Sequence, residues 1–344
     1  MVQFFDDYDV KYPDLVMDIV EFFSAKNRGK INEYKKSKKL GPIFCFIEKY
    51  KDTTDPNGPY PVQPSIVERI CSKLCSLGIM ERLRSNSNLA QLDDFIHFLD
   101  INCNDEITRE RNSQMLNSLV YGFEYIYKTY KAKVKPILFE ASNGDITVGS
   151  GFEIFGGIAT AKHCLEGSKS IAIQGYSADV LSKAKILTHT NKNIDIAFID
   201  ISDKEQISPY VAEAKILDDV LVMGYPKIPM FTDFLTAERA TISSQAIGRI
   251  TPTVGNIAAQ GDTIQHTSLF LVTARIKGGN SGGPVINSRG EVVAIACADT
   301  DLSEGDYDKL GYGVATPAKY LLEIMTKPIV DELTGIVIFK DFNT

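Results

Sequence analysis

Residues 279–284 read Gly-Asn-Ser-Gly-Gly-Pro and contain the chain's strongest candidate for a chemically reactive side chain, Ser281. Glycines adopt backbone conformations that other residues resist, so they allow a serine to stand on a tight turn. They also let backbone N–H groups come close to a substrate carbonyl group. The pattern therefore predicts a serine nucleophile presented on a turn.

Two other segments supply the groups that such a serine needs. Residues 160–164 read Thr-Ala-Lys-His-Cys, and residues 193–198 read Asn-Ile-Asp-Ile-Ala-Phe. A serine hydroxyl is a poor nucleophile at neutral pH unless a neighbouring base takes its proton. His163 is the predicted general base and then general acid, and Asp195 is predicted to hold its imidazole in the correct tautomer. The predicted reaction is acyl transfer.

The order of these residues along the chain decides between protein folds. The four histidines are His97, His163, His189 and His266, so none follows Ser281. The serine motif also matches the Gly-x-Ser-x-Gly turn of α/β-hydrolases, whose histidine must follow the serine. The subtilisin order starts with an aspartate, and no comparable aspartate motif precedes His163. The order histidine, aspartate, serine is that of chymotrypsin.

The three segments resemble the trypsin/chymotrypsin superfamily, especially its compact bacterial Deg/HtrA-like branch, over about residues 134–344. The resemblance implies a serine endopeptidase with a double β-barrel, acting on a protein or peptide substrate and using no cofactor or metal. It also implies an oxyanion hole formed by the backbone N–H groups of Gly279 and Ser281. His189 and His266 lie outside the family motifs, and we expect them to be structural or surface residues.

The chain departs from that family at two positions that matter for activation and redox state. Asn280 stands where many trypsin-like zymogens have an aspartate, and no Ile-Val-Gly-Gly sequence precedes the barrel. We therefore expect no activation by cleavage there. Secreted relatives pair the cysteine after the catalytic histidine with one before the first Gly-Gly. Phe155 occupies that second position, so we expect Cys164 to be a reduced, buried thiol.

The resemblance also indicates a specificity pocket formed by Arg275, Asp299 and Gly313. Arg275 lies six residues before the nucleophile, Asp299 lies on the pocket-wall strand, and Gly313 matches the rear glycine. An inward guanidinium would repel Lys or Arg in a substrate and attract an acidic residue. Asp299 could instead pair with Arg275, or Arg275 could point to solvent. Each of these arrangements of the pocket predicts poor cleavage after Lys or Arg. The exception is a pocket that contains Asp299 alone.

The composition of the chain restricts the kinds of partner and the cellular compartment that we expect for it. The chain has 344 residues with 37 Lys+Arg and 44 Asp+Glu, a net charge of −7. Residues 1–133 contain 19 of each sign, so we expect no nucleic-acid partner. No apolar run approaches a membrane span, and no signal peptide is visible. We therefore expect no membrane association and a cytoplasmic location.

The pattern of elements predicts an α+β chain with two domains. Residues 1–133 read as helical, with helices at 13–25, 64–78 and 112–133 and a winged-helix-like stretch after residue 64. Residues 134–344 contain short β-rich runs separated by turns, then a terminal helix at 317–327. We expect the first domain to regulate the peptidase or to recruit a protein trigger.

Two other functions remain open at this stage. The chain could be an interaction protein that keeps a protease fold without activity, although an intact triad argues against that. It could also be a winged-helix-like nucleic-acid-binding regulator, although the balanced charge of residues 1–133 argues against it.

Overall fold

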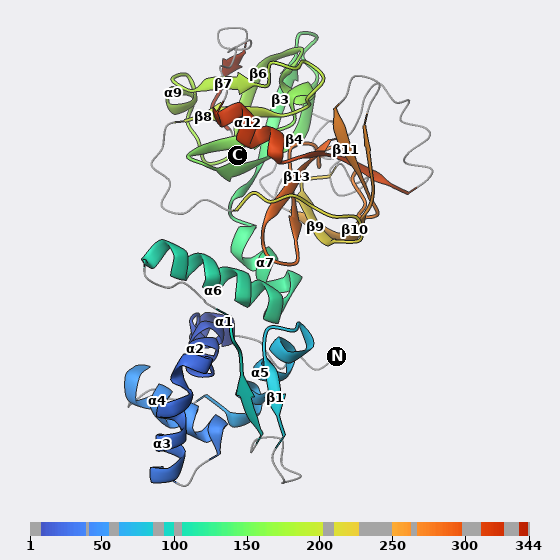
Figure 1. Cartoon of the computed structure of the whole chain (residues 1–344). Helices are drawn as coiled ribbons and strands as arrows, with labels where there is room; N and C mark the ends of the chain where they lie inside the picture. Colours follow the sequence, from blue (N-terminus) through green and yellow to red (C-terminus); the bar gives the residue numbers. More distant parts are fainter. Residues whose placement is uncertain are drawn as a thin grey trace. The chain divides into compact units, whose positions relative to one another are not determined.

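The computed structural model describes residues 8–38, 41–54, 62–84, 93–99, 105–201, 210–226, 250–262, 267–297, 311–326 and 337–342 (Figure 1). The chain divides into two compact units, Met1–Tyr125 and Ile126–Thr344. The boundary predicted from the sequence lies between residues 133 and 134. Among the described residues, every helix is too short or too polar to cross a bilayer.

The N-terminal unit combines helices with a small hairpin. Its elements are α1 (Tyr8–Lys11), α2 (Leu15–Phe22), η1 (Ala25–Asn27), α3 (Arg28–Lys38), α4 (Pro42–Thr54), α5 (Pro64–Ser76), β1 (Glu81–Leu83), β2 (Asp94–Ile96) and α6 (Glu106–Tyr121). β1 and β2 pair antiparallel, and Ser24 forms an isolated parallel bridge with His97. The hairpin thus follows α5 directly and returns to the start of the unit.

The core of this unit explains why its helices form. α2 and α5 place apolar residues at helical spacing, and these residues are buried in one cluster. The rings of Phe22, Phe23, Phe46 and Phe95 meet in that cluster with centroids 5.0–6.5 Å apart. Gly78, at φ +71°, follows α5 in a conformation that favours glycine. Both helices lie within the ranges predicted from the sequence.

The single long helix predicted at 112–133 is wrong, because the chain forms two helices there. α6 ends at Tyr121, and α7 spans Phe123–Tyr130. Gly122 separates them with φ +76°, outside the helical region, while its N–H donates to the Ser118 carbonyl at 2.8 Å. Glycine adopts this conformation without a steric penalty. The helix therefore breaks at Gly122, although the apolar residues keep their helical spacing on both sides of it.

The C-terminal unit begins inside α7, which explains why the observed boundary precedes the predicted one. Ile126 and Tyr130 are buried, and the Tyr130 ring packs edge-on against Phe152 with centroids 5.9 Å apart. The Tyr130 hydroxyl also donates to the Gly290 carbonyl at 2.8 Å. The last turn of α7 is therefore part of the β-rich unit that it precedes.

One half of the C-terminal unit is a seven-stranded sheet in the order β15-β6-β3-β4-β5-β8-β7. Its strands are β3 (Val134–Ala141), β4 (Ile146–Ile154), β5 (Gly157–Thr160), β6 (Ser168–Ile173), β7 (Lys185–Thr188), β8 (Ala197–Asp200) and β15 (Ile338–Phe339). The pairs are antiparallel except for β15, which joins β6 in parallel. Two short helices, α8 (Lys162–Leu165) and α9 (Ala178–Leu181), interrupt it.

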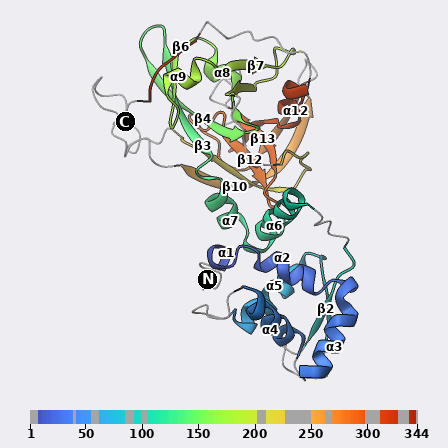
Figure 2. The ribbon, with the colours of Figure 1, turned by 90° about the vertical axis from the view of Figure 1, so that its left-hand side faces the viewer.

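The other half is a closed six-stranded barrel in the order β10-β11-β14-β13-β12-β9. Its strands are β9 (Asp219–Gly224), β10 (Thr251–Asp262), β11 (Ser268–Val272), β12 (Pro284–Asn287), β13 (Val292–Cys297) and β14 (Gly313–Pro317), and α12 (Lys319–Thr326) follows. The two β halves lie side by side, with β3 and β4 beside β9 (Figure 2).

The predicted fold class is confirmed: a helical N-terminal region precedes a β-rich domain with a helix, α12, near its C-terminal end, which the short strand β15 follows. The prediction of two barrels needs one refinement. Among the described residues, backbone pairing closes the second half, whereas β15 and β7 form the edges of the first. That first sheet still wraps a core of its own, with Ile137, Ile158 and Ile199 fully buried.

We predict that Tyr130→Phe lowers the free energy of unfolding by about 1–2 kcal/mol, because the Gly290 carbonyl loses its donor in a buried position. Equilibrium denaturation of the full chain measures the change. Tyr127→Phe, on the same helix but only half-buried, is the matched control and should change stability by less than about 0.5 kcal/mol. Equal effects of the two substitutions would contradict this account.

Candidate active site

His163 is presented at the end of a buried strand. β5 ends at Thr160, Ala161 is the N-cap of α8, and His163 lies in the first turn of that short helix. The Thr160 hydroxyl donates to the Ser150 carbonyl at 2.8 Å, which ties this end of β5 to β4. The imidazole is half-buried, with 24% of its side-chain surface exposed.

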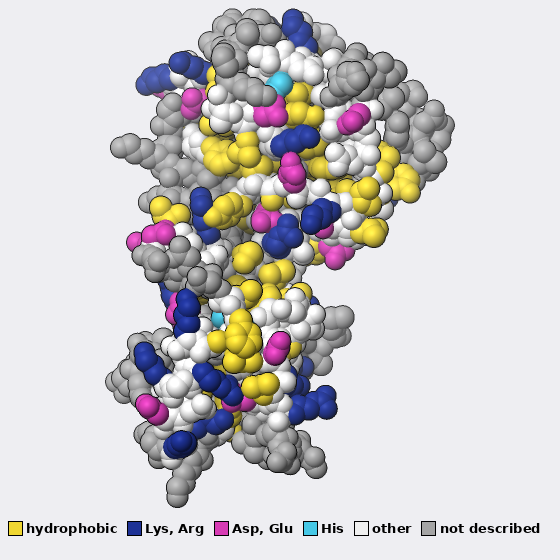
Figure 3. Space-filling model, viewed as in Figure 1, with side chains coloured by type: hydrophobic (Ala, Val, Ile, Leu, Met, Phe, Trp, Pro, Cys, Tyr) yellow, Lys and Arg dark blue, Asp and Glu magenta, His cyan; other side chains and the backbone are white. Residues whose placement is uncertain are grey.

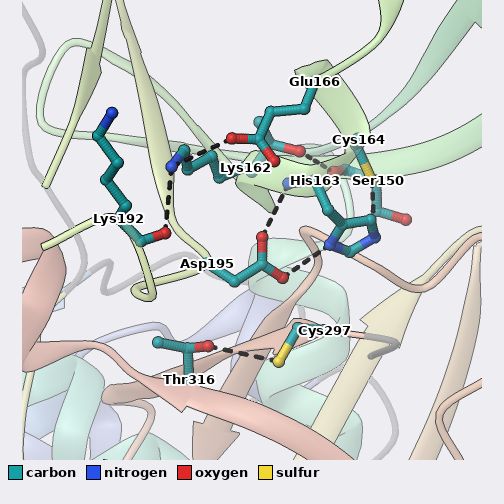
Figure 4. A network of polar contacts seen from close by, with 10 residues as sticks. Ser150, Lys162, His163, Cys164, Glu166, Lys192, Asp195, Cys297 and Thr316 are labelled. Atoms are coloured by element: carbon teal, nitrogen blue, oxygen red, sulfur yellow. Dashed lines mark hydrogen bonds and ion pairs between the residues drawn. The ribbon is translucent and has the colours of Figure 1, made fainter. Parts of the chain in front are cut away.

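Asp195 holds His163 by two hydrogen bonds from one carboxylate (Figure 4). Its Oδ1 accepts the backbone N–H of His163 at 2.8 Å, and its Oδ2 contacts the ring Nδ1 at 2.7 Å. A carboxylate accepts, so Nδ1 carries the proton. The Nε2 atom is left with its lone pair, which is the tautomer that a general base requires.

Lys162 connects the helix that carries His163 with the loop that carries Asp195. Its Nζ donates to the Lys192 carbonyl at 3.2 Å and pairs with the Glu166 carboxylate at 3.1 Å (Figure 4). The Lys162 side chain is only 7% exposed, so both contacts compensate a buried charge. Lysine in this motif gave no signal in the sequence beyond its place beside the histidine.

Ser281 stands on a turn that needs its glycines. Gly279 and Gly282 have φ values of +96° and +89°, which side-chain-bearing residues rarely adopt. Backbone hydrogen bonds hold the turn: the Asn280 and Gly283 N–H groups donate to the carbonyl groups of Lys277 and Asn280 at 2.9 Å, and the Gly282 N–H donates to Ala296 on β13 at 2.7 Å. Ser281 is 4% exposed, so this turn presents it at a site that is largely shielded from water.

Ser150 on β4 clamps the serine turn from the other half of the unit. Its N–H donates to the Ser281 carbonyl at 2.8 Å, and its hydroxyl donates to the Gly279 carbonyl at 2.7 Å. The same hydroxyl accepts the N–H of Tyr225 at 2.9 Å. Ser150 is fully buried. The sequence analysis did not predict that Ser150 positions the nucleophile.

Gly282 brings the two halves of the site together. A Cβ atom at this position would lie 2.0 Å from the Ser150 carbonyl oxygen and 2.4 Å from the Thr160 Oγ1 atom. Only glycine allows the serine turn to seat against β4 and the end of β5. Because β5 leads directly into α8, this contact joins the nucleophile's turn to the strand that presents His163.

Gly279, a predicted oxyanion-hole donor, lies in the same turn as Ser281. Its carbonyl accepts the Ser150 hydroxyl at 2.7 Å, a buried hydrogen bond that fixes the peptide between Gly279 and Asn280. In the described part of the chain, no hydrogen-bond acceptor contacts the Gly279 N–H. Backbone N–H groups that face the developing oxyanion stabilise the tetrahedral intermediate.

Cys164 differs from the prediction in its burial. It is a free thiol, but it is half-buried and its Sγ lies 3.4 Å from the His163 Nε2. Burial disfavours the charged imidazolium and is the largest single influence. The hydrogen bonds to Asp195 and Cys164, together with their charge interactions, outweigh it and raise the pKa of His163 well above its usual 6.5.

The predicted pocket residues lie in different environments. Arg275 is exposed, and its carbonyl accepts the Thr253 hydroxyl at 3.1 Å, which favours the alternative in which its side chain points to solvent. Asp299 lies outside the described residues. Gly313 packs against Ile276, since a Cβ at Gly313 would lie 2.6–2.8 Å from three Ile276 carbon atoms. Ile276 is 8% exposed.

The other histidines have different surroundings. His189 accepts the Asn191 N–H at its Nδ1, at 2.9 Å, and contacts the Glu323 carboxylate through Nε2 at 2.9 Å. This pairing joins the end of β7 to α12, as a structural residue would. His266 lies outside the described residues. Within the described ranges, His, Cys, Asp and Glu side chains form no group of three suited to a metal ion.

Comparison with known proteins gives matches to one protein family and to several individual proteins. Residues 149–295 match the family model of the trypsin-like peptidase domain. The serine protease Do-like HtrB of Bacillus subtilis is 24% identical over 180 residues, which are 51% of this chain and 35% of that protein. A probable periplasmic serine endoprotease, DegP-like, of Chlamydia trachomatis is 31% identical over 125 residues, 33% of this chain and 23% of that protein.

Solved structures align with the chain over a similar extent. The active form of the Rv3671c protease of M. tuberculosis covers 61% of this chain and 88% of its own, at 20% identity and a TM-score of 0.42. The chain therefore spans about a third of the B. subtilis relative and most of the M. tuberculosis structure. His163, Asp195 and Ser281 all fall within residues 149–295, the range that matches the trypsin-like peptidase family model.

Proposed function

We propose that this protein is a serine endopeptidase that uses His163, Asp195 and Ser281. The observation that carries the proposal is the pair of hydrogen bonds that His163 makes to the Asp195 carboxylate, which leaves Nε2 able to accept a proton. The seating of Gly282 on Ser150 and Thr160 supports it, because it sets the serine turn against the strand that leads to His163. A protein or peptide is the substrate class.

The reaction follows from these positions. His163 Nε2 takes the hydroxyl proton as Ser281 Oγ attacks the substrate carbonyl carbon, and the carbonyl oxygen becomes an oxyanion. The Gly279 and Ser281 N–H groups would stabilise that charge. The imidazolium then gives its proton to the leaving amine as the peptide bond breaks. Water, deprotonated by His163, attacks the acyl ester and returns the serine hydroxyl.

Ser281→Ala should lower kcat/KM on a fluorogenic peptide by a factor on the order of 10⁴ or more, because the attacking oxygen is removed. The same substitution should abolish covalent labelling by a fluorophosphonate. Ser182→Ala, an exposed serine on the turn after α9, is the matched control and should retain activity and labelling. Labelling that survives in Ser281→Ala would contradict the assignment of Ser281 as the nucleophile. If the parent protein shows neither labelling nor cleavage, it is an interaction protein that keeps a protease fold without activity.

The contact between Cys164 and His163 predicts an unusual pH profile. A base works only in its neutral form, so a raised pKa moves the acidic limb of the kcat/KM profile to higher pH. We expect activity to rise with pH from 6.5 upward. Cys164→Ala removes two of the influences that raise the pKa, so its acidic limb should move to lower pH.

Cys297→Ala is the control for that experiment, since the Cys297 thiol contacts the Thr316 hydroxyl at 3.3 Å. It should leave the midpoint of the acidic limb unchanged. A Cys164→Ala profile that coincides with the parent profile would mean that the thiol does not tune the base.

Ile276 suggests an apolar specificity pocket. The residues before the nucleophile alternate: Ala274 is buried, Arg275 is exposed and Ile276 is buried. Ile276 lies on Gly313, the glycine that the family resemblance assigns to the rear of the pocket. We infer that its side chain makes the pocket shallow and apolar. A small aliphatic substrate residue fits such a site, whereas Lys or Arg would bury a charge without a partner.

Ile276→Ala should open this pocket. We expect the ratio of kcat/KM for peptides with Phe before the scissile bond to those with Val to rise about tenfold or more, since a few methylene groups of pocket space are worth 1–3 kcal/mol. Leu271→Ala, a half-buried change on β11, should leave the ratio unchanged. Efficient cleavage after Lys or Arg by the parent protein would contradict the apolar pocket and point to Asp299.

Two further expectations remain proposals. A cytoplasmic location is supported by the described cysteines, which form no disulfide, as expected for a reducing compartment.

Regulation by the N-terminal unit is supported by Asn280, which replaces the aspartate of cleavage-activated relatives and whose amide instead contacts the Arg275 carbonyl at 3.5 Å. A control other than cleavage would then be needed.

A further inference from the structure

The N-terminal unit, residues 1–125, contains 16 Lys+Arg and 19 Asp+Glu, and these charges are separated along the chain. Residues 26–84 contain 13 Lys+Arg and 6 Asp+Glu. Residues 1–25 contain 1 and 6, and residues 85–125 contain 2 and 7. The basic stretch contains α3, α4, α5 and β1, whereas the acidic stretches contain α1, α2, β2 and α6. In Figure 3, dark blue side chains predominate over magenta at the end of the unit that carries α3.

The basic stretch ends in a helix followed by the first strand of a hairpin. α5 leads through Gly78 into β1, and β1 pairs with β2. α5 packs against α2, α4, α6 and β1, and its buried residues are Ile66, Val67, Ile70, Cys71 and Leu74. Helix-turn-helix proteins place such a supported helix in the major groove of DNA.

The outer side of α5 carries a stripe of basic and hydroxyl-bearing residues. Ser65, Arg69, Ser72, Lys73 and Ser76 recur at spacings of three and four residues and form one stripe, here called the α5 stripe. Ser72 is half-exposed and the other four are exposed. The stripe contains two cations, three hydroxyl groups and no acid. These are the groups that contact phosphates and base edges.

Glu68 on α5 and Asp94 on the hairpin are paired within the unit, whereas Glu81 on β1 is exposed. The Glu68 carboxylate accepts the Ser72 hydroxyl at 2.8 Å and pairs with Arg82. On the hairpin, Asp94 pairs with Arg28 at 2.8 Å and with Lys35 at 3.2 Å. These pairs lower the repulsion that a polyanion would meet. Exposed cations elsewhere in the basic stretch add to the positive field: Lys30, Lys36 and Arg84.

We propose that the N-terminal unit binds duplex DNA, with the α5 stripe in the major groove. An α-helix has the diameter of the B-form major groove, about 10–12 Å. The major groove of duplex RNA is too deep and narrow for a helix, so DNA is the duplex that this surface fits. The inference is independent of the peptidase, since none of its residues belongs to the serine site.

The test uses the full chain carrying Ser281→Ala and a fluorescein-labelled DNA duplex of random sequence. Fluorescence anisotropy between 50 and 200 mM salt should give an affinity that falls steeply with salt. Arg69→Ala with Lys73→Ala should reduce the slope of log K against log salt by about 1.8, because each lost phosphate contact contributes about 0.9. Affinity near 0.1 M salt should drop tenfold or more.

A matched control changes two exposed lysines of the other unit, Lys183→Ala with Lys185→Ala, and should leave the slope unchanged. Ser65→Glu is a second variant, since an acid in the first turn favours the helix while repelling phosphate. It should weaken binding and keep the thermal melting temperature. A duplex RNA of the same sequence should compete poorly.

Three results would overturn the proposal. The first is no anisotropy change at 50 mM salt. The second is equal weakening by the α5 pair and the control pair, which would indicate non-specific attraction. The third is binding that ignores both α5 variants, or RNA competition as strong as that of DNA. The first result would leave the α5 stripe as a surface for a protein partner. Because Ser281→Ala is used throughout, failure here leaves the peptidase proposal untouched.

Discussion

The site depends on one steric constraint, the contact of Gly282 with the Ser150 carbonyl. No side chain fits between them, because a Cβ would lie 2.0 Å from that oxygen. The contact seats a turn of the closed barrel on a strand of the seven-stranded sheet, so neither half of the unit holds the site alone. The hydrogen bonds of Ser150 to the Gly279 and Ser281 carbonyl groups then fix the turn in orientation as well as in position.

A second constraint is electrostatic, because the other half of the site contains partly buried charges. The Asp195 carboxylate is 27% exposed and receives two N–H groups from a single residue. The Lys162 ammonium is 7% exposed and is held by a carboxylate and a carbonyl. An uncompensated charge at either position would be costly. The pairing therefore holds the loop before β8 and the helix α8 in one arrangement, which is what a positioned base requires.

The sequence predicted the site's chemistry better than its supports. His163, Asp195 and Ser281 were identifiable because their order and local motifs are specific, and most strands were visible as β-branched runs. Ser150 and Lys162 were not, because their functions arise from contacts with residues distant in the chain. Gly122 was overlooked because apolar spacing runs through it, and spacing reports on burial and not on φ. β10 escaped prediction for the converse reason: its twelve residues are mostly polar or small, and backbone pairing holds them in the sheet.

Net charge read from the sequence is limited in the same way, because it does not report where the fold places each charge. A total of zero over residues 1–133 says little about a partner, since a polyanion responds to the field at the surface that it meets. In this unit most of the acids lie in residues 1–25 and 85–125, and Asp94 of the second stretch pairs with Arg28 and Lys35 of the basic stretch. Arg69 and Lys73 of α5 are exposed. Composition averages over the whole unit, whereas the fold separates these groups, so a balanced total does not exclude a polyanionic partner.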